Sequence, residues 1–250
     1  MVNTHGFFER VQAQCPVRRV MSRSGDCILE IEFPAGGKLR SRTIVSRSRA
    51  RPTGKYPSLK MGRMMQWESH NELNAFRLLD ATPAAVAFHE QPLAVRFQLH
   101  GSVHTHFPDV LVQWRDSREL WEIKPKEEAL DPLISERTKL LAATLPTLGF
   151  QYRMVLSDEL RAQPRLNNVL TLLRFGREPV ADDQRERVRR LLCEVPSISW
   201  SAAIQGALGP KGVSSLCRLV LEGVLHVDLE AGELMHAGSF CLAPSESVGA

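Results

Sequence analysis

The chain has 250 residues, of which 43% are hydrophobic, and a formal net charge of +4. This length suits one large domain or two modest ones, and this composition is normal for a folded protein. No apolar run approaches the ~20 residues that a membrane helix needs, and the first residues lack the apolar stretch of a signal peptide. The five cysteines are scattered without a Cys-x-x-Cys pair. We therefore expect a cytoplasmic protein with no membrane association, no disulfide framework and no cysteine zinc site.

The first expected strand, residues 27–33, precedes a strongly basic segment. Between Arg40 and Arg63 the chain has eight basic residues and no acidic one, and residues 53–57 predict a turn within this segment. Such a block can neutralise DNA phosphates, the alternative being a solvated connector. Its position just before a predicted helix favours the DNA contact. The expected DNA-binding residues are Arg47, Arg49, Arg51, Lys55, Lys60 and Arg63.

A helix is expected from Ser69 to the break at Thr82-Pro83. Ser69 and Glu72 have the spacing of a capping box, and apolar residues follow at broadly helical spacing. Glu72 is then either the capping residue alone or a carboxylate with a chemical role. Glu68, one turn earlier, is its rival for that role.

The next strands are expected at residues 86–89, 93–99 and 103–107. Residues 110–114 and 120–124 then flank a polar turn and predict a β-hairpin. Because side chains alternate along a strand, Glu122 and Lys124 share one face. The hairpin can bring Asp109 close to both of them at one end of a sheet.

A helix carboxylate, a Pro-Asp opening one strand and a Glu-x-Lys in the next strand indicate a metal-dependent nuclease. Mg²⁺ is held by a few carboxylates and lowers the pKa of its bound water while polarising a phosphoryl oxygen. Asp109 and Glu122 are the expected main ligands, and Glu72 either completes the shell or holds a metal-bound water. Lys124 would orient the water or neutralise charge in the transition state. We expect Mn²⁺ to substitute for Mg²⁺.

The remaining pattern predicts a helix at residues 132–145, a buried strand at 150–156 and a helix from Pro164 to Phe175. Mixed strands with flanking helices favour a three-layer α/β core. His100, His104 and His106 lack the cysteine or acidic cluster that would complete a zinc site. We interpret them as strand residues that reach a phosphate near Asp109.

A second unit is expected to begin near Arg177. Residues 182–193, 198–204 and 214–222 predict helices and residues 223–229 a strand, an order typical of a winged helix. Its few basic side chains are countered by Glu222 and Asp228. This charge balance favours protein docking over DNA reading.

The middle of the chain resembles the TnsA-type endonuclease subunit of heteromeric bacterial transposases, in the PD-(D/E)xK nuclease superfamily. The resemblance covers about residues 50–177. The motifs that carry it are residues 54–61 and 67–72, Glu90-Gln91-Pro92, Phe107-Pro108-Asp109, Glu122-Ile123-Lys124-Pro125, and residues 166–170 and 172–175.

The resemblance implies roles for particular residues and an arrangement of domains. Glu72, Asp109, Glu122 and Lys124 fall on the family's catalytic positions, and Ile123 joins the three carboxylates in the metal-binding set. A restriction-endonuclease-like core is expected at residues 51–177, with a mixed central sheet flanked by helices. N-terminal strands and the basic connector (1–50) pack on this core, and a small winged-helix-like domain (178–250) follows it.

The resemblance also implies a function and partners. The protein would use Mg²⁺ to cut the 5′, non-transferred strand of double-stranded DNA at transposon ends, which permits cut-and-paste transposition in a bacterial cytoplasm. A TnsB-type transposase with an RNase H-like core would cut the other strand. A TnsC-type AAA+ ATPase regulator would contact the C-terminal domain. The alternatives are a stand-alone restriction or repair nuclease of the same superfamily and a catalytically inactive DNA-bound assembly factor.

Overall fold

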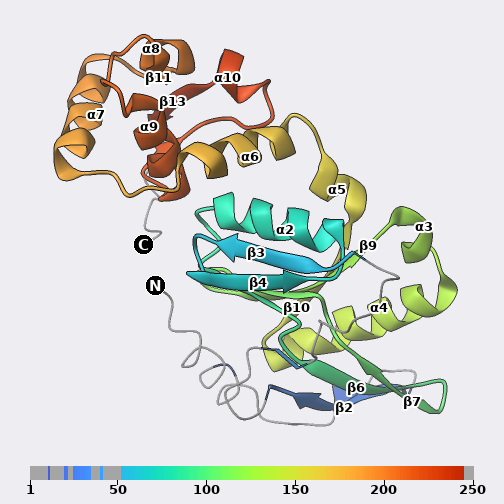
Figure 1. The fold of residues 1–250 in the computed structure, drawn as a ribbon. Helices are drawn as coiled ribbons and strands as arrows, with labels where there is room; N and C mark the ends of the chain where they lie inside the picture. Colours follow the sequence, from blue (N-terminus) through green and yellow to red (C-terminus); the bar gives the residue numbers. More distant parts are fainter. Residues whose placement is uncertain (1–10, 12–19, 22–24, 35–39, 42–51, 245–250) are drawn as a thin grey trace. The chain divides into compact units, whose positions relative to one another are not determined.

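The computed structural model describes residue 11 and residues 20–21, 25–34, 40–41 and 52–244 (Figure 1). Three of the expected DNA-binding residues, Arg47, Arg49 and Arg51, lie outside these residues. The internal contacts divide the chain into two compact units: Met1–Phe76 with Ala85–Leu160, and Arg77–Ala84 with Arg161–Ala250. This division assigns residues 165–175 to the second unit, whereas the sequence assigned them to the nuclease core. The three-part division expected from the sequence stays a prediction.

The first unit contains two four-stranded sheets. One sheet is antiparallel, in the order β1 (Val20–Met21), β2 (Cys27–Glu32), β6 (Ala94–Leu99) and β7 (Ser102–His106). The other is mixed, in the order β10 (Gln151–Leu156), β9 (Arg118–Lys124), β8 (Val110–Gln113) and β5 (Ala87–Glu90). Only β9 and β10 run parallel in this sheet. The mixed α/β class is therefore confirmed.

The predicted hairpin of the site is β8 and β9. Val110 pairs with Trp121, and the backbone N–H of Asp109 donates to the Trp121 carbonyl at 2.9 Å. This register places the Pro-Asp step beside the Glu-x-Lys step, as the alternation of the two strands predicted. Parallel pairing with β10 sets Met154 opposite Glu122 on the other side of β9.

An apolar core joins both sheets of the first unit. It includes Ile28 of β2, Val95 of β6, Leu111 of β8 and Leu120 of β9, all fully buried. Helix α4 (Pro132–Thr144) adds Leu141 to this core, with Asp131 capping its start by accepting two backbone N–H bonds. The short helices α3 (Lys126–Ala129) and α5 (Ser157–Arg161) follow β9 and β10. Strand β9 is thus held at its two edges by β8 and β10, and on one face by the apolar core that contains Leu120.

A hairpin occupies the segment where the sequence predicted only a turn. Strands β3 (Gly54–Ser58) and β4 (Arg63–Trp67) form a two-stranded ribbon. The expectation of a turn at residues 53–57 is therefore wrong. Pro57 is tolerated because a two-stranded ribbon leaves one edge of each strand unpaired. Gly54 allows close packing, since a Cβ atom there would lie 2.3 Å from Cζ2 of Trp67.

Helix α2 (His70–Ala81) begins next to this ribbon. Phe76 of α2 contacts Tyr56 of β3 and Phe88 of β5, with ring centroids 6.4 Å and 5.8 Å apart. The contact with Phe88 holds the second turn of α2 near the mixed sheet, and the contact with Tyr56 holds it near the ribbon. The predicted helix from Ser69 to residue 81 is confirmed, with Ser69 as the capping residue.

The second unit combines helices with a small antiparallel sheet. Its helices are α6 (Arg165–Phe175), α7 (Asp182–Glu194), α8 (Trp200–Ile204), α9 (Gly212–Leu221) and α10 (Leu234–Ala237). Its sheet has the order β11 (Ile198–Ser199), β13 (Ser239–Leu242) and β12 (Leu225–His226). The strand expected at 223–229 covers only two residues. Among the described residues, we find no helix with the length and apolar character to cross a bilayer.

Candidate active site

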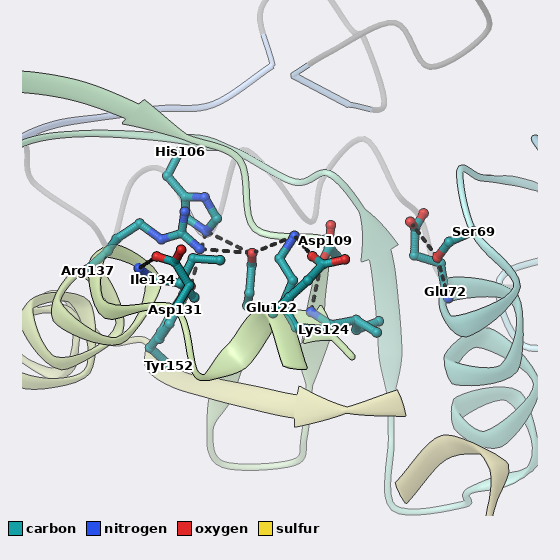
Figure 2. A network of polar contacts seen from close by, with 12 residues as sticks. Ser69, Glu72, His106, Asp109, Glu122, Lys124, Asp131, Ile134, Arg137 and Tyr152 are labelled. Carbon is teal, nitrogen blue, oxygen red and sulfur yellow. Dashed lines mark hydrogen bonds and ion pairs between the residues drawn. The ribbon is translucent and has the colours of Figure 1, made fainter. Parts of the chain in front are cut away.

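Asp109, Glu122 and Lys124 come together at the start of β8 and the end of β9 (Figure 2). The Asp109 carboxylate accepts the backbone N–H of Ile123 through Oδ2, at 2.7 Å. Lys124 Nζ lies 3.6 Å from Glu122 Oε1. The hairpin register explains this arrangement, because it sets the residue before β8 beside the last residues of β9. Two carboxylates and an ammonium group thus share one end of the mixed sheet.

Glu122 is surrounded by side chains from three other elements. Arg137 of α4 donates to Glu122 Oε1 at 3.0 Å. His106, at the end of β7, has Nε2 2.9 Å from Glu122 Oε2 and 3.1 Å from the hydroxyl of Tyr152 on β10. The sequence pattern predicts His106 near the site but does not single out Arg137 or Tyr152. Nothing in their sequence context marks either residue, since the contact arises only when α4 and β10 pack beside β9.

The two carboxyl groups of the site have opposite electrostatic environments. Burial raises the pKa of Asp109 well above its ordinary value, and the charges of Glu122 and Glu72 add to this effect. Burial acts in the same direction on Glu122. There, however, His106, Arg137 and Lys124 together lower the pKa below its ordinary value. Glu122 is therefore held ionised, while an ionised Asp109 lacks enough positive charge nearby.

Glu72 forms the helix cap at the start of α2. Its carboxylate accepts the Ser69 hydroxyl at 3.0 Å and the backbone N–H of Glu68 at 2.9 Å, and the Glu72 N–H donates to Ser69 Oγ. Figure 2 shows Glu72 on the helix to one side of Asp109, Glu122 and Lys124, with His106 and Arg137 on the other side. The side chain of Glu72 thus takes the capping position, one of the two roles that the sequence allows. Its charge still acts on Asp109.

Residues Glu90 and Gln91 support the same end of the sheet. Glu90 is fully buried and accepts two hydrogen bonds from the guanidinium group of Arg63, at 2.8 Å and 2.6 Å. Gln91, at a φ of 42°, donates its backbone N–H to the Asp109 carbonyl at 2.9 Å. Its side-chain amide donates to Glu68 at 3.2 Å. The Glu-Gln pair therefore links β4, the start of β8 and Glu68, which lies two residues before α2.

A comparison with protein-family models decides which known proteins this segment resembles. Residues 82–157 match the model described as TnsA-like endonuclease N terminal. This segment is similar to a TnsA-like endonuclease domain. The match includes Asp109, Glu122 and Lys124 and excludes Glu72, and it confirms the resemblance predicted from the motifs. No curated protein matches the chain.

The TnsA-like domain implies nuclease activity on DNA, and nucleases of this kind typically depend on metal ions. Within the described part of the chain, no three His, Cys, Asp or Glu side chains form a ready metal-binding group. Mg²⁺ often takes only one or two carboxylates and completes its shell with water and substrate phosphate. Asp109 and Glu122 fit that smaller set. The raised pKa of Asp109 marks a place where added positive charge would be favourable.

The described basic residues of the expected DNA-binding segment have different surroundings. Arg63 is engaged by Glu90, with its side chain 14% exposed. The ammonium group of Lys60 donates to the carbonyl of Ala85. Lys55 is exposed on β3. The structure therefore gives Arg63 an internal partner that the sequence did not predict, while DNA contact by this segment stays a prediction.

Proposed function

We propose that the protein is the endonuclease subunit of a bacterial transposase. It cuts the 5′, non-transferred strand at transposon ends, beside a TnsB-type transposase with an RNase H-like core that cuts the other strand. The observation that carries this proposal is the meeting of Asp109, Glu122 and Lys124 within the segment that matches the TnsA-like model. A nuclease that hydrolyses a phosphodiester needs such a set of carboxylates with a neighbouring cation.

Asp109 and Glu122 would hold Mg²⁺, for which Mn²⁺ would substitute. Ile123 joins this set through its backbone carbonyl, because its side chain is hydrocarbon and 6% exposed. When bound, the metal would supply an activated water and charge neutralisation at the phosphate. Lys124, partly exposed beside Glu122, neutralises the charge that develops on the phosphate. Glu72 serves as the third carboxylate if its side chain leaves the cap, with Glu68 as its rival.

The second unit is proposed to dock a protein partner, a TnsC-type AAA+ ATPase regulator. On α7, Arg189 and Arg190 pair with Glu186, and Arg185 of α7 and Arg218 of α9 pair with Glu222. These ion pairs engage four arginines of the unit with its own glutamates, so they favour a protein contact over binding to a polyanion. The helices and three-stranded sheet suit the winged-helix-like arrangement proposed for residues 178–250, and a three-layer arrangement is proposed for the core.

The alternative function is a stand-alone restriction or repair nuclease. It shares the site, so only the dependence on the transposase separates the two functions. We would incubate the full chain with a supercoiled plasmid that carries transposon ends, in Mg²⁺, with and without the transposase subunit. The proposal predicts double-strand breaks at the ends only when both proteins are present. Site-specific breaks by the chain alone would support the stand-alone nuclease.

The catalytically inactive assembly factor predicts a third result in the same assay. With both proteins present, only nicks at the 3′ ends would form, with the same products whether or not this chain is added. An Asp109→Asn variant is the matched control, because it keeps the size of the side chain and an acceptor for the Ile123 N–H. A loss of double-strand breaks with this variant would assign them to the site described here.

A further inference from the structure

A cavity of about 340 Å³ lies beside Glu122, within the first unit. The cross-strand pairs Phe97↔His104 and Leu99↔Ser102 put residues from β6 and β7 along its wall. Helix α4 contributes Leu133, Ile134 and Arg137. The base of the cavity is apolar, since Phe97 and Leu99 form a buried cluster with Leu140.

The lining of this cavity suits a flat aromatic ligand that belongs to a polyanion. The rings of Phe97 and His104 are stacked, with centroids 5.4 Å apart and planes at 23°. Around them lie His100, Ser102 and Arg137, which can hydrogen bond to the edge of a base. No acidic residue lines the cavity, and its lining residues His100 and Arg137 pair with carboxylates outside the lining, Glu136 at 3.3 Å and Glu122 at 3.0 Å.

The cavity adjoins the nuclease site through two shared residues. His106 and Arg137 line it, and both also contact Glu122. A strand whose phosphate lies at Asp109 and Glu122 therefore has its neighbouring nucleotide within reach of the Phe97–His104 stack. The volume is at the lower end of the ~300–1,000 Å³ of small-molecule sites, which suits one nucleotide rather than a larger ligand.

We propose that this cavity receives one nucleobase of the DNA strand being cut, unstacked from the duplex next to the scissile phosphate. This proposal rests on the nuclease function proposed above. Enzymes that draw a base out of a duplex compensate the lost stacking with aromatic side chains and with hydrogen bonds to the edge of the base. The exposed ring of His104, packed against the buried ring of Phe97, supplies the stacking, and Ser102, His100 and Arg137 supply the polar contacts. The cavity then fixes the position of the cut relative to one particular nucleotide.

The test is a double-mutant cycle, in which the removal of one side chain is combined with the removal of one base. The full chain, carrying Lys124→Ala to prevent cutting, is titrated in Mg²⁺ onto fluorescein-labelled transposon-end duplexes that the transposase subunit has already bound, and affinity is followed by anisotropy. An abasic site is moved one nucleotide at a time along each strand. His104→Ala removes the ring from the cavity, and Ser102→Trp fills the cavity. Val103→Ala is the matched control, because Val103 lies on the same strand and is not part of the lining.

The proposal predicts one position at which loss of the base weakens binding at least about fivefold, the lower end for one base–aromatic stack. In His104→Ala and in Ser102→Trp the same abasic site should change the affinity less than about twofold, while Val103→Ala should behave like the parent chain. The proposal would be overturned if the abasic site changed the affinity equally in the parent chain and in His104→Ala. It would also be overturned if no position were sensitive to loss of the base, or if the chain did not bind the DNA.

Separate strand-cleavage mapping distinguishes this proposal from the proposed function. Cleavage at the transposon ends without the predicted coupling would leave the nuclease function and remove the base pocket. If His104 and the base were coupled but the complete assembly did not cleave DNA, the base pocket would stand and the nuclease function would be wrong. If His104→Ala instead weakens retention of the purified transposase subunit and leaves DNA affinity unchanged, the cavity holds a protein segment and the proposal is wrong.

Discussion

At the scale of single residues, the main feature is the contrast between Glu122 and Asp109. Glu122 has Arg137, Lys124 and His106 around it, so its negative charge is compensated inside the protein. The Asp109 carboxylate accepts one backbone hydrogen bond, from Ile123. Its pKa is raised by burial and by the negative charges of Glu122 and Glu72. A divalent cation between these two carboxylates would supply the charge that Asp109 lacks. This asymmetry gives each of the neighbouring residues a separate prediction.

The pH dependence of stability follows from the raised pKa of Asp109. An acid whose folded-state pKa is raised favours the folded state most below its unfolded-state pKa, and this contribution is lost as the pH rises through the folded-state value. Asp109→Asn should therefore stabilise the metal-free protein at pH 7 by about 1 kcal/mol, and the gain should shrink at acidic pH. Thermal or urea unfolding across this pH range measures it. Equal stability of both proteins at pH 7 would contradict the unfavourable charge assigned to Asp109.

Arg137 is expected to position Glu122. Arg137→Ala leaves Glu122 Oε1 without its guanidinium donor, and changes of this kind around a metal ligand cost about 10- to 100-fold in metal affinity or activity. We expect the Mg²⁺ concentration for half-maximal cleavage to rise by that order. Arg153→Ala is the control, because Arg153 pairs with the exposed Glu159. An unchanged Mg²⁺ requirement would show that Lys124 and His106 hold Glu122 without Arg137.

The choice between Glu72 and Glu68 can be made without disturbing the helix. Glutamine at residue 72 can keep the capping box, which accepts Glu or Gln at this position. Glu72→Gln should then unfold within about 0.5 kcal/mol of the parent chain, yet lose most cleavage if Glu72 is the third carboxylate. Glu68→Gln should keep its activity. The opposite pattern in strand-cleavage assays would transfer the role to Glu68.

At the scale of secondary-structure elements, the buried ion pair between β4 and β5 supports the site. Glu90 is 1% exposed in its side chain and binds both terminal nitrogens of Arg63, so removal of its charge leaves a buried guanidinium without its counterion. Glu90→Gln should destabilise the protein by about 3 kcal/mol in urea unfolding. Glu30→Gln, which breaks the exposed pair with Arg96, should cost less than about 1 kcal/mol. Similar costs for the two variants would contradict this structural role of Glu90.

The same elements show what the sequence could and could not predict. Strand alternation predicted that Glu122 and Lys124 share a face, and the hairpin pattern placed Asp109 beside them. The capping box located the start of α2. The β3–β4 ribbon was missed because Gly54 and Pro57 usually mark turns, whereas here Gly54 makes room for the ring of Trp67. Arg137 and Tyr152 were missed because their contacts depend on how α4 and β10 pack on β9, which no local pattern encodes.

At the scale of the whole molecule, the match to the TnsA-like model covers residues 82–157, which contain three of the four proposed catalytic residues. The rest of the chain, including the second unit, connects this nuclease to the transposase and its regulator in our proposal. Such a division of labour predicts that the nuclease acts only on DNA that the transposase has already bound. The polarity of the cut strand is therefore the property that best identifies the protein.

The most direct measurement is to map the broken strands at both transposon ends after incubation with the transposase and Mg²⁺. The parent chain would be compared with Lys124→Ala and with Lys126→Ala, whose side chain is exposed on α3 outside the site. We predict 5′-strand cuts, and hence double-strand breaks, with the parent chain and Lys126→Ala, and only 3′-end nicks with Lys124→Ala. Identical products from all three proteins would contradict the account, because Lys124 and the site around it would then not cut DNA.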